Sequence, residues 1–184
     1  MAVATREVPL PLQQLPNALT VARFLVVPVF VVLLARANGG HSWPAGIVFG
    51  SAAVTDQIDG WLARRWRVES DFGRIVDPLA DRLMIDAAVV LLVVAGRLPW
   101  PAILIVGARD LLLLAGLKLL APRGIRVEVN RLGKLATWVL YAGTGFLMVT
   151  YSSDDWALWV FWTGVGLAVA AGAQYVLETW RRIR

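Results

Sequence analysis

The chain has 184 residues, of which 58 % are hydrophobic and only 17 % are charged, and its mean hydropathy is +0.65. Ordinary soluble domains carry roughly a quarter charged residues. A soluble core of this size could not cover so much apolar surface, so we expect a lipid bilayer to solvate part of the chain. The length favours one domain over residues 1–184. The absence of cysteine excludes disulfides and thiolate metal sites.

The net charge of +5 and the isoelectric point near 10.4 leave two classes of anionic partner open, nucleic acid and membrane lipid. The basic residues lie between apolar stretches rather than in one patch. Such a distribution is typical of cytoplasmic loops beside anionic lipid, so we expect a bilayer and no nucleic acid.

The first 16 residues do not form a convincing secretory signal. They contain Glu7 and the prolines Pro9, Pro11 and Pro16, and no small-residue cleavage site cleanly follows the first apolar run. We interpret residues 1–16 as a cytoplasmic segment.

Six apolar stretches follow, each close to the roughly 20 residues that cross a bilayer. They are Leu19–Arg36, Trp43–Leu62, Ile75–Ala95, Pro99–Leu120, Leu132–Tyr151 and Trp156–Thr179. Glycines such as Gly143, Gly145, Gly164, Gly166 and Gly172 would let neighbouring helices approach closely. The sequence therefore predicts an all-α integral membrane protein with six transmembrane helices.

Loop charges predict the orientation of these helices. Lys and Arg gather before the first stretch, between the second and third, between the fourth and fifth, and at the C-terminus. The loops at 37–43, 96–100 and 151–155 are poor in them. By the positive-inside rule both termini face the cytoplasm, in a multi-pass protein of the cell (inner) membrane. Trp43, Trp100 and Trp156 fall at the outer ends, where interfacial anchors are expected.

Four carboxylates stand against this apolar background: Asp56 and Asp59 near the end of the second stretch, and Asp77 and Asp81 near the start of the third. Ionisable groups at membrane depth are costly and are functional candidates by default. Spacings of three and four place each pair on one helix face. A hairpin would bring the two faces together near the cytoplasmic surface.

Four carboxylates in one cavity repel one another unless a cation neutralises them or some take up protons. Oxygen ligands without cysteine favour Mg²⁺ or Mn²⁺. We therefore expect a polar metal-binding cavity on the cytoplasmic side, with Arg64 as a forked donor suited to phosphate. The alternative is a purely architectural network of these carboxylates with Arg64, Arg74 and Arg82.

The string D-x2-D-G-x2-A-R-x8-G-x3-D-x3-D resembles the signature of the CDP-alcohol phosphotransferases. Its fixed positions are Asp56, Asp59, Gly60, Ala63, Arg64, Gly73, Asp77 and Asp81. The six-span topology resembles the same family, so the likeness covers nearly the whole chain. The resemblance implies an enzyme that transfers a phosphatidyl group from CDP-diacylglycerol to an alcohol and releases CMP.

The resemblance also implies residue roles. Asp56, Asp59 and Asp77 would hold the metal, with Asp81 at its edge as general base. The CDP-lipid would be contacted by Gly60, Ala63, Arg64, Ser70 and Gly73, and by Asn17 and Thr20 at the entry to the first helix. Asn17 or Thr20 could equally be the N-cap of that helix, and the two roles are compatible. A homodimer is also implied.

We expect the second half of the chain to bind the acceptor alcohol. Arg109 and Lys134 lie in or beside apolar stretches and would suit a small anion, with Arg126 as a weaker candidate; alternatively, Arg109 simply pairs with Asp110. The segment Gly133-Lys134-Leu135-Ala136-Thr137 resembles both phosphatidylglycerophosphate synthases and cardiolipin synthases of this superfamily. Glycerol 3-phosphate is the first expectation, phosphatidylglycerol the second and inositol phosphate the third.

Non-enzymatic alternatives are a small cation transporter and a structural membrane protein. A transporter predicts carboxylates spread along a pathway, often in repeated halves, whereas these cluster at one edge without a second copy. Outside the signature, we expect Asp86 to pair with Arg82 four residues earlier. We interpret the single histidine, His41, as a surface residue.

Overall fold

A computed structural model describes the backbone of residues 10–66, 71–120 and 131–183, and the side chains of residues 22, 24–55, 82–112 and 131–174. Within this part of the chain every long element is an α-helix, and no strand occurs. The helices are α1 (Leu10–Ala35), α2 (Trp43–Trp66), α3 (Asp71–Val94), α4 (Pro101–Leu120), α5 (Arg131–Val149) and α6 (Asp155–Ile183), with a 3₁₀ turn at Asn38–Gly40.

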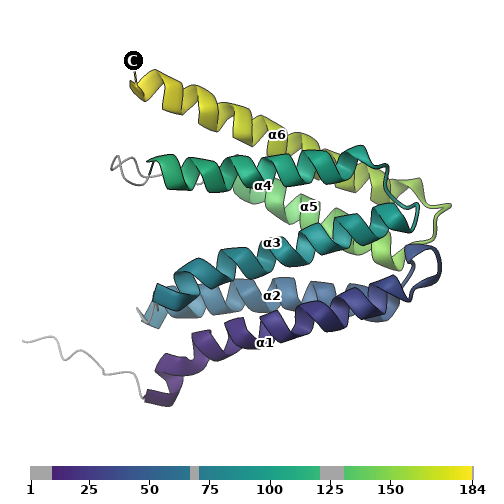
Figure 1. The fold of residues 1–184 in the computed structure, drawn as a ribbon, viewed down its shortest axis with the longest axis horizontal. Helices are drawn as coiled ribbons and strands as arrows, with labels where there is room; N and C mark the ends of the chain where they lie inside the picture. Colours follow the sequence, from purple (N-terminus) through teal and green to yellow (C-terminus); the bar gives the residue numbers. More distant parts are fainter. Residues whose placement is uncertain (1–9, 67–70, 121–130, 184) are drawn as a thin grey trace, which may run out of the picture.

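Successive helices run in opposite directions, so the bundle has two distinct ends (Figure 1). One end holds the start of α1, the end of α2, the start of α3, the end of α4, the start of α5 and the end of α6. The opposite end holds the connections after α1, α3 and α5. Helix α1 packs against α2 and α3, α3 packs against α4 and α5, and the most extensive contact joins α5 to α6. The helix ends that flank the two expected sets of loops therefore lie at opposite ends of the bundle.

The six predicted apolar stretches are confirmed as helices, with most boundaries shifted by a few residues. The largest difference is at the first, where α1 begins at Leu10 and runs through Asn17 and Thr20. The N-cap interpretation of these two residues was therefore wrong. Pro11 occupies the first helical turn, where a missing N–H costs nothing because it would have no acceptor in the helix.

The core draws apolar side chains from all six helices, including Val106 of α4. Phe30 of α1, Phe49 of α2, Leu92 of α3, Leu140 of α5 and Phe161 of α6 are all fully buried. Phe49 links two helices to α2, since its ring lies 5.6 Å from that of Phe30 and 5.4 Å from that of Tyr141. These contacts fix α2, which carries two of the signature aspartates, between α1 and α5.

Two glycines explain the close α5–α6 contact. A Cβ at Gly143 would lie 2.6 Å from backbone atoms of Phe161, and a Cβ at Gly164 would lie 2.6 Å from the backbone nitrogen of Leu140. The predicted close approach is confirmed at both. It is not found at Gly166 and Gly172, where a Cβ would meet no described neighbour.

Polar contacts tie together the connections at the end opposite the signature. Nδ1 of His41 lies 3.1 Å from the carbonyl oxygen of Thr150, and the histidine ring stacks on Tyr151 at 4.3 Å. Arg97 donates to the Leu147 carbonyl at 2.9 Å and to the Thr150 hydroxyl at 3.0 Å. The interpretation of His41 as a simple surface residue was therefore wrong, because it joins the loop after α1 to the loop after α5.

The outer surface of the bundle is strongly apolar. Leu25, Ile47, Leu104, Leu111 and Trp159 each expose 60 % or more of their area. Two helical segments in the described part are long and apolar enough to cross a bilayer, Arg131–Val149 and Asp155–Gln174, and two shorter apolar segments are Phe24–Ala35 and Trp43–Thr55. Trp43, Trp100 and Trp156 are exposed at the predicted helix ends.

Candidate active site

The signature lies on two helices that meet the same end of the bundle. Asp56 and Asp59 belong to the last part of α2, and Asp77 and Asp81 to the first part of α3. The end of α2 and the start of α3 lie together with the start of α1, at the end where the described chain also begins and finishes (Figure 1). A helix turns once in 3.6 residues, so each pair of aspartates lies on one face, separated by about 4.5 and 6 Å along the axis.

Other predicted contacts fall at the same end. Gly60, Ala63 and Arg64 continue α2, Gly73 lies in the first turn of α3, and Asn17 and Thr20 lie on α1. Helix α1 packs against both signature helices, so its position agrees with a shared site. The side chains of all these residues lie outside the described set, as do Ser70 and Arg126 entirely.

The donor set of the signature fits a hard divalent cation. Its four potential ligands are carboxylates, carried on two helices whose site-bearing ends lie at one end of the bundle, and oxygen ligands are those that Mg²⁺ and Mn²⁺ prefer. Among the described side chains, no group of three His, Cys, Asp or Glu residues could hold a metal ion. The signature therefore has no competitor as a metal site in that part of the chain.

Next to the signature, side chains from three helices form a polar network. The Nη1 group of Arg82 on α3 donates to the backbone carbonyl of Asp110 on α4 at 2.9 Å. Arg109 donates through Nη1 to Oδ1 of Asp110 at 3.2 Å and through Nη2 to the Thr137 hydroxyl of α5 at 3.0 Å. That hydroxyl in turn donates to the Gly133 carbonyl at 3.0 Å. The network links the residue after Asp81 to the start of α5.

The network lies at the same depth in the bundle as the last aspartate of the signature. Asp81 lies ten residues after the start of α3, and Asp110 ten residues before the end of α4. Both distances correspond to about 15 Å of helix from the signature end. Because α3 packs against α4 and Arg82 reaches the backbone of Asp110, these two levels coincide in the fold.

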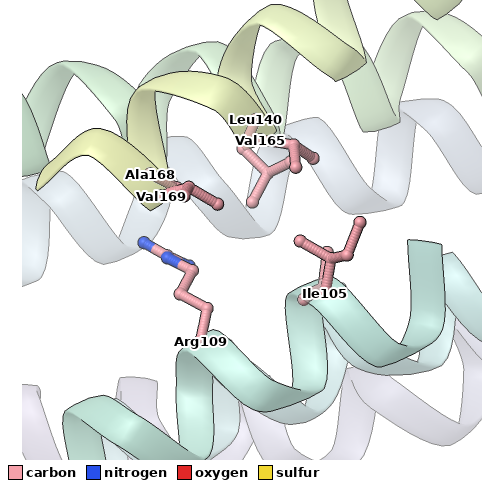
Figure 2. Close-up of a pocket in the computed structure, with 7 residues that line it drawn as sticks. Ile105, Arg109, Leu140, Val165, Ala168 and Val169 are labelled. Carbon is pink, nitrogen blue, oxygen red and sulfur yellow. The ribbon is translucent and has the colours of Figure 1, made fainter. Parts of the chain in front are cut away.

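Arg109 points from α4 into the bundle, and its guanidinium lies beside Ala168 and Val169 of α6 (Figure 2). It lines a cavity of only about 10 Å³, bounded also by Ile105, Leu140 and Val165. Such a volume holds one water molecule at most. This cavity is therefore too small for a phosphate group.

The two described acceptor candidates, Arg109 and Lys134, lie in different surroundings. Arg109 is not free, since the predicted alternative of pairing with Asp110 is found, and Thr137 adds a second partner. Lys134 is exposed on α5, one turn before Thr137. Arg82 and Asp86 attract one another electrostatically, but no ion pair within 4 Å joins these two described side chains, because Arg82 donates to the carbonyl of Asp110.

Sequence reasoning gave no role to Thr137 and treated Asp110 only as a partner. The spacing of Gly133 and Thr137 was the available signal, because a threonine four residues after a carbonyl can bond back to it within a helix. The inter-helix contact with Arg109 could not be predicted without the packing of α4 on α5. Oδ2 of Asp110 meets no hydrogen-bond partner among the described residues, although only 5 % of the residue is exposed.

Comparisons with known proteins agree with the signature. The chain is 32 % identical, over 92 % of its length and 97 % of the relative's, to the CDP-diacylglycerol–glycerol-3-phosphate 3-phosphatidyltransferase of Bacillus subtilis. It is 33 % identical to a probable phosphatidylglycerophosphate synthase of Mycobacterium tuberculosis, over 92 % of this chain and 83 % of that protein. It is 36 % identical to a CMP-forming cardiolipin synthase of Streptomyces coelicolor, over 92 % and 84 %.

The family-level match spans the bundle. Residues 13–170 match the sequence profile described as CDP-alcohol phosphatidyltransferase, from within α1 to within α6. The matched region contains the whole signature and the polar network beside it. The chain therefore belongs to the CDP-alcohol phosphatidyltransferase family.

Proposed function

We propose that this protein is a phosphatidylglycerophosphate synthase, which transfers the phosphatidyl group of CDP-diacylglycerol to glycerol 3-phosphate and releases CMP. The observation that carries the proposal is the complete signature on α2 and α3 in a chain whose relatives from B. subtilis and M. tuberculosis bear names of this activity. The residues beside the signature supply cations suited to a small phosphate acceptor.

We further propose that all six helices cross the cell membrane with the signature end in the cytoplasm. The apolar outer surface and the exposed tryptophans at the opposite end support a bilayer around the bundle. The helix ends that flank the basic segments of the sequence lie on the signature side, which the positive-inside rule would place in the cytoplasm. Water-soluble glycerol 3-phosphate would then enter from the cytoplasm, while CDP-diacylglycerol would enter from the lipid.

The chemistry assigned to the chain is a single displacement. Asp81 takes the proton from the acceptor hydroxyl. The hydroxyl oxygen bonds to the phosphorus that carries diacylglycerol, and the bond from that phosphorus to the CMP oxygen breaks, with CMP keeping the electron pair. Asn17, Thr20 and Arg64 would orient the CDP part, together with the small residues Gly60, Ala63 and Gly73. Positioning and charge stabilisation would supply most of the rate.

Asp56, Asp59 and Asp77, with Asp81 at the edge, would hold Mg²⁺ or Mn²⁺. When bound, the ion would neutralise pyrophosphate charge and stabilise the leaving CMP. Without such a cation, four carboxylates at one end of the bundle would repel both one another and the pyrophosphate.

Cardiolipin synthesis is the second candidate function, because the S. coelicolor relative is 36 % identical to this chain. In that reaction phosphatidylglycerol would replace glycerol 3-phosphate as acceptor. The smaller acceptor is supported by the two cations Lys134 and Arg109, because a phosphate monoester carries more negative charge than a phosphodiester and would gain more from them.

An acceptor panel tests the proposal. Purified protein in detergent is given CDP-diacylglycerol, Mg²⁺ and one of glycerol 3-phosphate, phosphatidylglycerol or inositol phosphate, and the lipid product is identified by mass. Phosphatidylglycerophosphate as the main product supports the first function. Cardiolipin as the main product would replace it with the second.

We also propose a homodimer. Gly166 and Gly172 of α6 offer small residues without a described neighbour above them, and such positions let helices of two copies approach in a membrane. Cross-linking in native membranes through cysteines placed at these positions tests the assignment. Absence of cross-linked dimers at every concentration of the protein in the membrane would contradict the homodimer.

A further inference from the structure

Among the described side chains, one buried atom of α4 has no hydrogen-bond partner. The carboxylate of Asp110 receives Arg109 on Oδ1 at 3.2 Å, whereas Oδ2 meets no hydrogen-bond donor among the described residues. The side chain is 7 % exposed, so bulk water does not solvate this oxygen. Buried polar atoms in proteins are nearly always paired, and an unpaired one of this kind points to a role.

The surroundings decide what kind of group would pair with Oδ2. Asp86, Asp110, Arg82 and Arg109 lie close enough to influence one another electrostatically, and their formal charges balance. A further cation would meet two guanidinium groups already in place, which is unfavourable at close range. A neutral donor, such as a hydroxyl, adds no charge and satisfies the oxygen. Oδ2 is therefore best matched by a neutral donor, either the hydroxyl group of a ligand or a water molecule.

The position of Asp110 relates this hydroxyl to the reaction. Arg82, which bonds the Asp110 backbone, directly follows Asp81, and Arg109 has N–H groups left after its bonds to Asp110 and Thr137. A polyol phosphate presents three groups: a phosphate, a reacting hydroxyl and a second hydroxyl. Arg109 would bind the phosphate, and Asp81 would take the proton of the reacting hydroxyl. Asp110 would then accept a hydrogen bond from the second hydroxyl.

We propose that Asp110 is a specificity-determining residue whose Oδ2 accepts a hydrogen bond from the non-reacting hydroxyl of a polyol phosphate acceptor. The inference rests on the proposed function. With this contact, the enzyme would prefer acceptors that carry a second hydroxyl next to the reacting one. An arginine that binds only the phosphate would not provide this preference. A site built to bond a hydroxyl strongly rejects the analogue that lacks it.

The test compares two acceptors in the same protein. Purified full-length enzyme with Mg²⁺ and CDP-diacylglycerol is given glycerol 3-phosphate or 3-hydroxypropyl phosphate, which lacks only the middle hydroxyl, and kcat/KM is measured from CMP release. We expect the unaltered protein to prefer glycerol 3-phosphate by about tenfold or more, the effect of one hydrogen bond to a charged group. Equal use of the two acceptors would overturn the inference.

Variants locate the preference at Asp110. In Asp110→Ala the ratio of the two kcat/KM values should fall to about one, because any loss through Arg109 affects both phosphates alike. Asp110→Asn keeps the shape but not the charge, so the ratio should fall in part. Thr137→Val is the matched control: it removes the other partner of Arg109, so it should slow both acceptors and preserve the ratio.

The outcomes separate the inference from the proposed function. Transfer to glycerol 3-phosphate with a ratio that survives in both Asp110 variants would leave the function standing and overturn the inference, as a buried water on Oδ2 would predict. Absence of transfer to either acceptor by the unaltered protein would overturn the proposed function, and the inference with it.

Discussion

Asp81 is the residue whose replacement separates proton transfer from substrate binding. Asp81→Asn removes the proposed general base while preserving size, so turnover should fall by about 10²- to 10⁴-fold. Binding of CDP-diacylglycerol should be largely kept, because the base acts only when the proton leaves the acceptor. Steady-state rates at saturating Mg²⁺, with a separate binding assay for the CDP-lipid, measure both. Normal turnover would remove Asp81 from this role.

Asp56 and Asp59 should behave differently from Asp81. Replacing either with Asn removes one charged ligand from the proposed metal site, so Mg²⁺ binding should weaken and turnover should be lost. Isothermal titration calorimetry of the purified variants with Mg²⁺ measures the metal affinity independently of turnover. Unchanged Mg²⁺ affinity in both variants would place the metal elsewhere.

Lys134 offers the cleaner test of the acceptor phosphate site. Its side chain is exposed, so Lys134→Gln should change stability by less than about 0.5 kcal/mol. If Lys134 binds the acceptor phosphate, the KM for glycerol 3-phosphate should rise about ten- to a hundredfold, with little change in that for CDP-diacylglycerol. Arg109→Gln should act in the same direction but also destabilise the fold, because Asp110 would lose its ionic partner. Equal effects of Lys134→Gln on both substrates would exclude an acceptor-specific role.

At the scale of the helices, the length of the apolar stretches and the composition of the loops were sufficient to predict six elements. The outer loops were also predictable, because charged and apolar residues separate sharply along the chain. The start of α1 was not: a proline-rich segment reads as irregular, yet proline is tolerated in a first helical turn. The contacts of His41 and Arg97 with the end of α5 depend on which loops meet, which local sequence does not encode.

The site was predictable in unequal parts. Four aspartates at fixed spacing stand out against an apolar background, so their placement on two helices at one end of the bundle followed from the sequence. The polar network around Arg109 was not predictable. Two of its bonds, Arg82 to Asp110 and Arg109 to Thr137, join residues that lie 28 positions apart on different helices. Arg82 accordingly bonds a backbone carbonyl rather than the carboxylate four residues away.

The α5–α6 contact should be sensitive to single methyl groups. Gly143→Ala and Gly164→Ala would each place a Cβ within 2.6 Å of backbone atoms on the facing helix. The helices must then separate, at a cost of about 1–3 kcal/mol. Thermal unfolding in detergent should show a lowered midpoint for both. Gly50→Ala on α2 meets no neighbour within 4 Å and should leave the midpoint unchanged or slightly raised. Equal midpoints for all three would contradict the close packing.

At the scale of the whole molecule, the arrangement of all helix ends predicts which residues are reachable from each side of the membrane. The chain has no native cysteine, so single cysteines report position directly. A cysteine at Ser152, in the loop after α5, should react with a membrane-impermeant maleimide in intact cells. A cysteine at Ser70, between the two signature helices, should react only after the membrane is opened. Labelling of the Ser70 cysteine in intact cells would show that the signature end faces outward, opposite to the proposed orientation.

The central claim is that the signature end of this bundle joins glycerol 3-phosphate directly to the phosphatidyl group. Purified protein can be given CDP-diacylglycerol, Mg²⁺ and glycerol 3-phosphate carrying ¹⁸O in its terminal, reacting hydroxyl, and both products analysed by mass. We predict phosphatidylglycerophosphate that retains the ¹⁸O, together with unlabelled CMP. Phosphatidic acid as the lipid product, or CMP release that does not depend on glycerol 3-phosphate, would contradict the account.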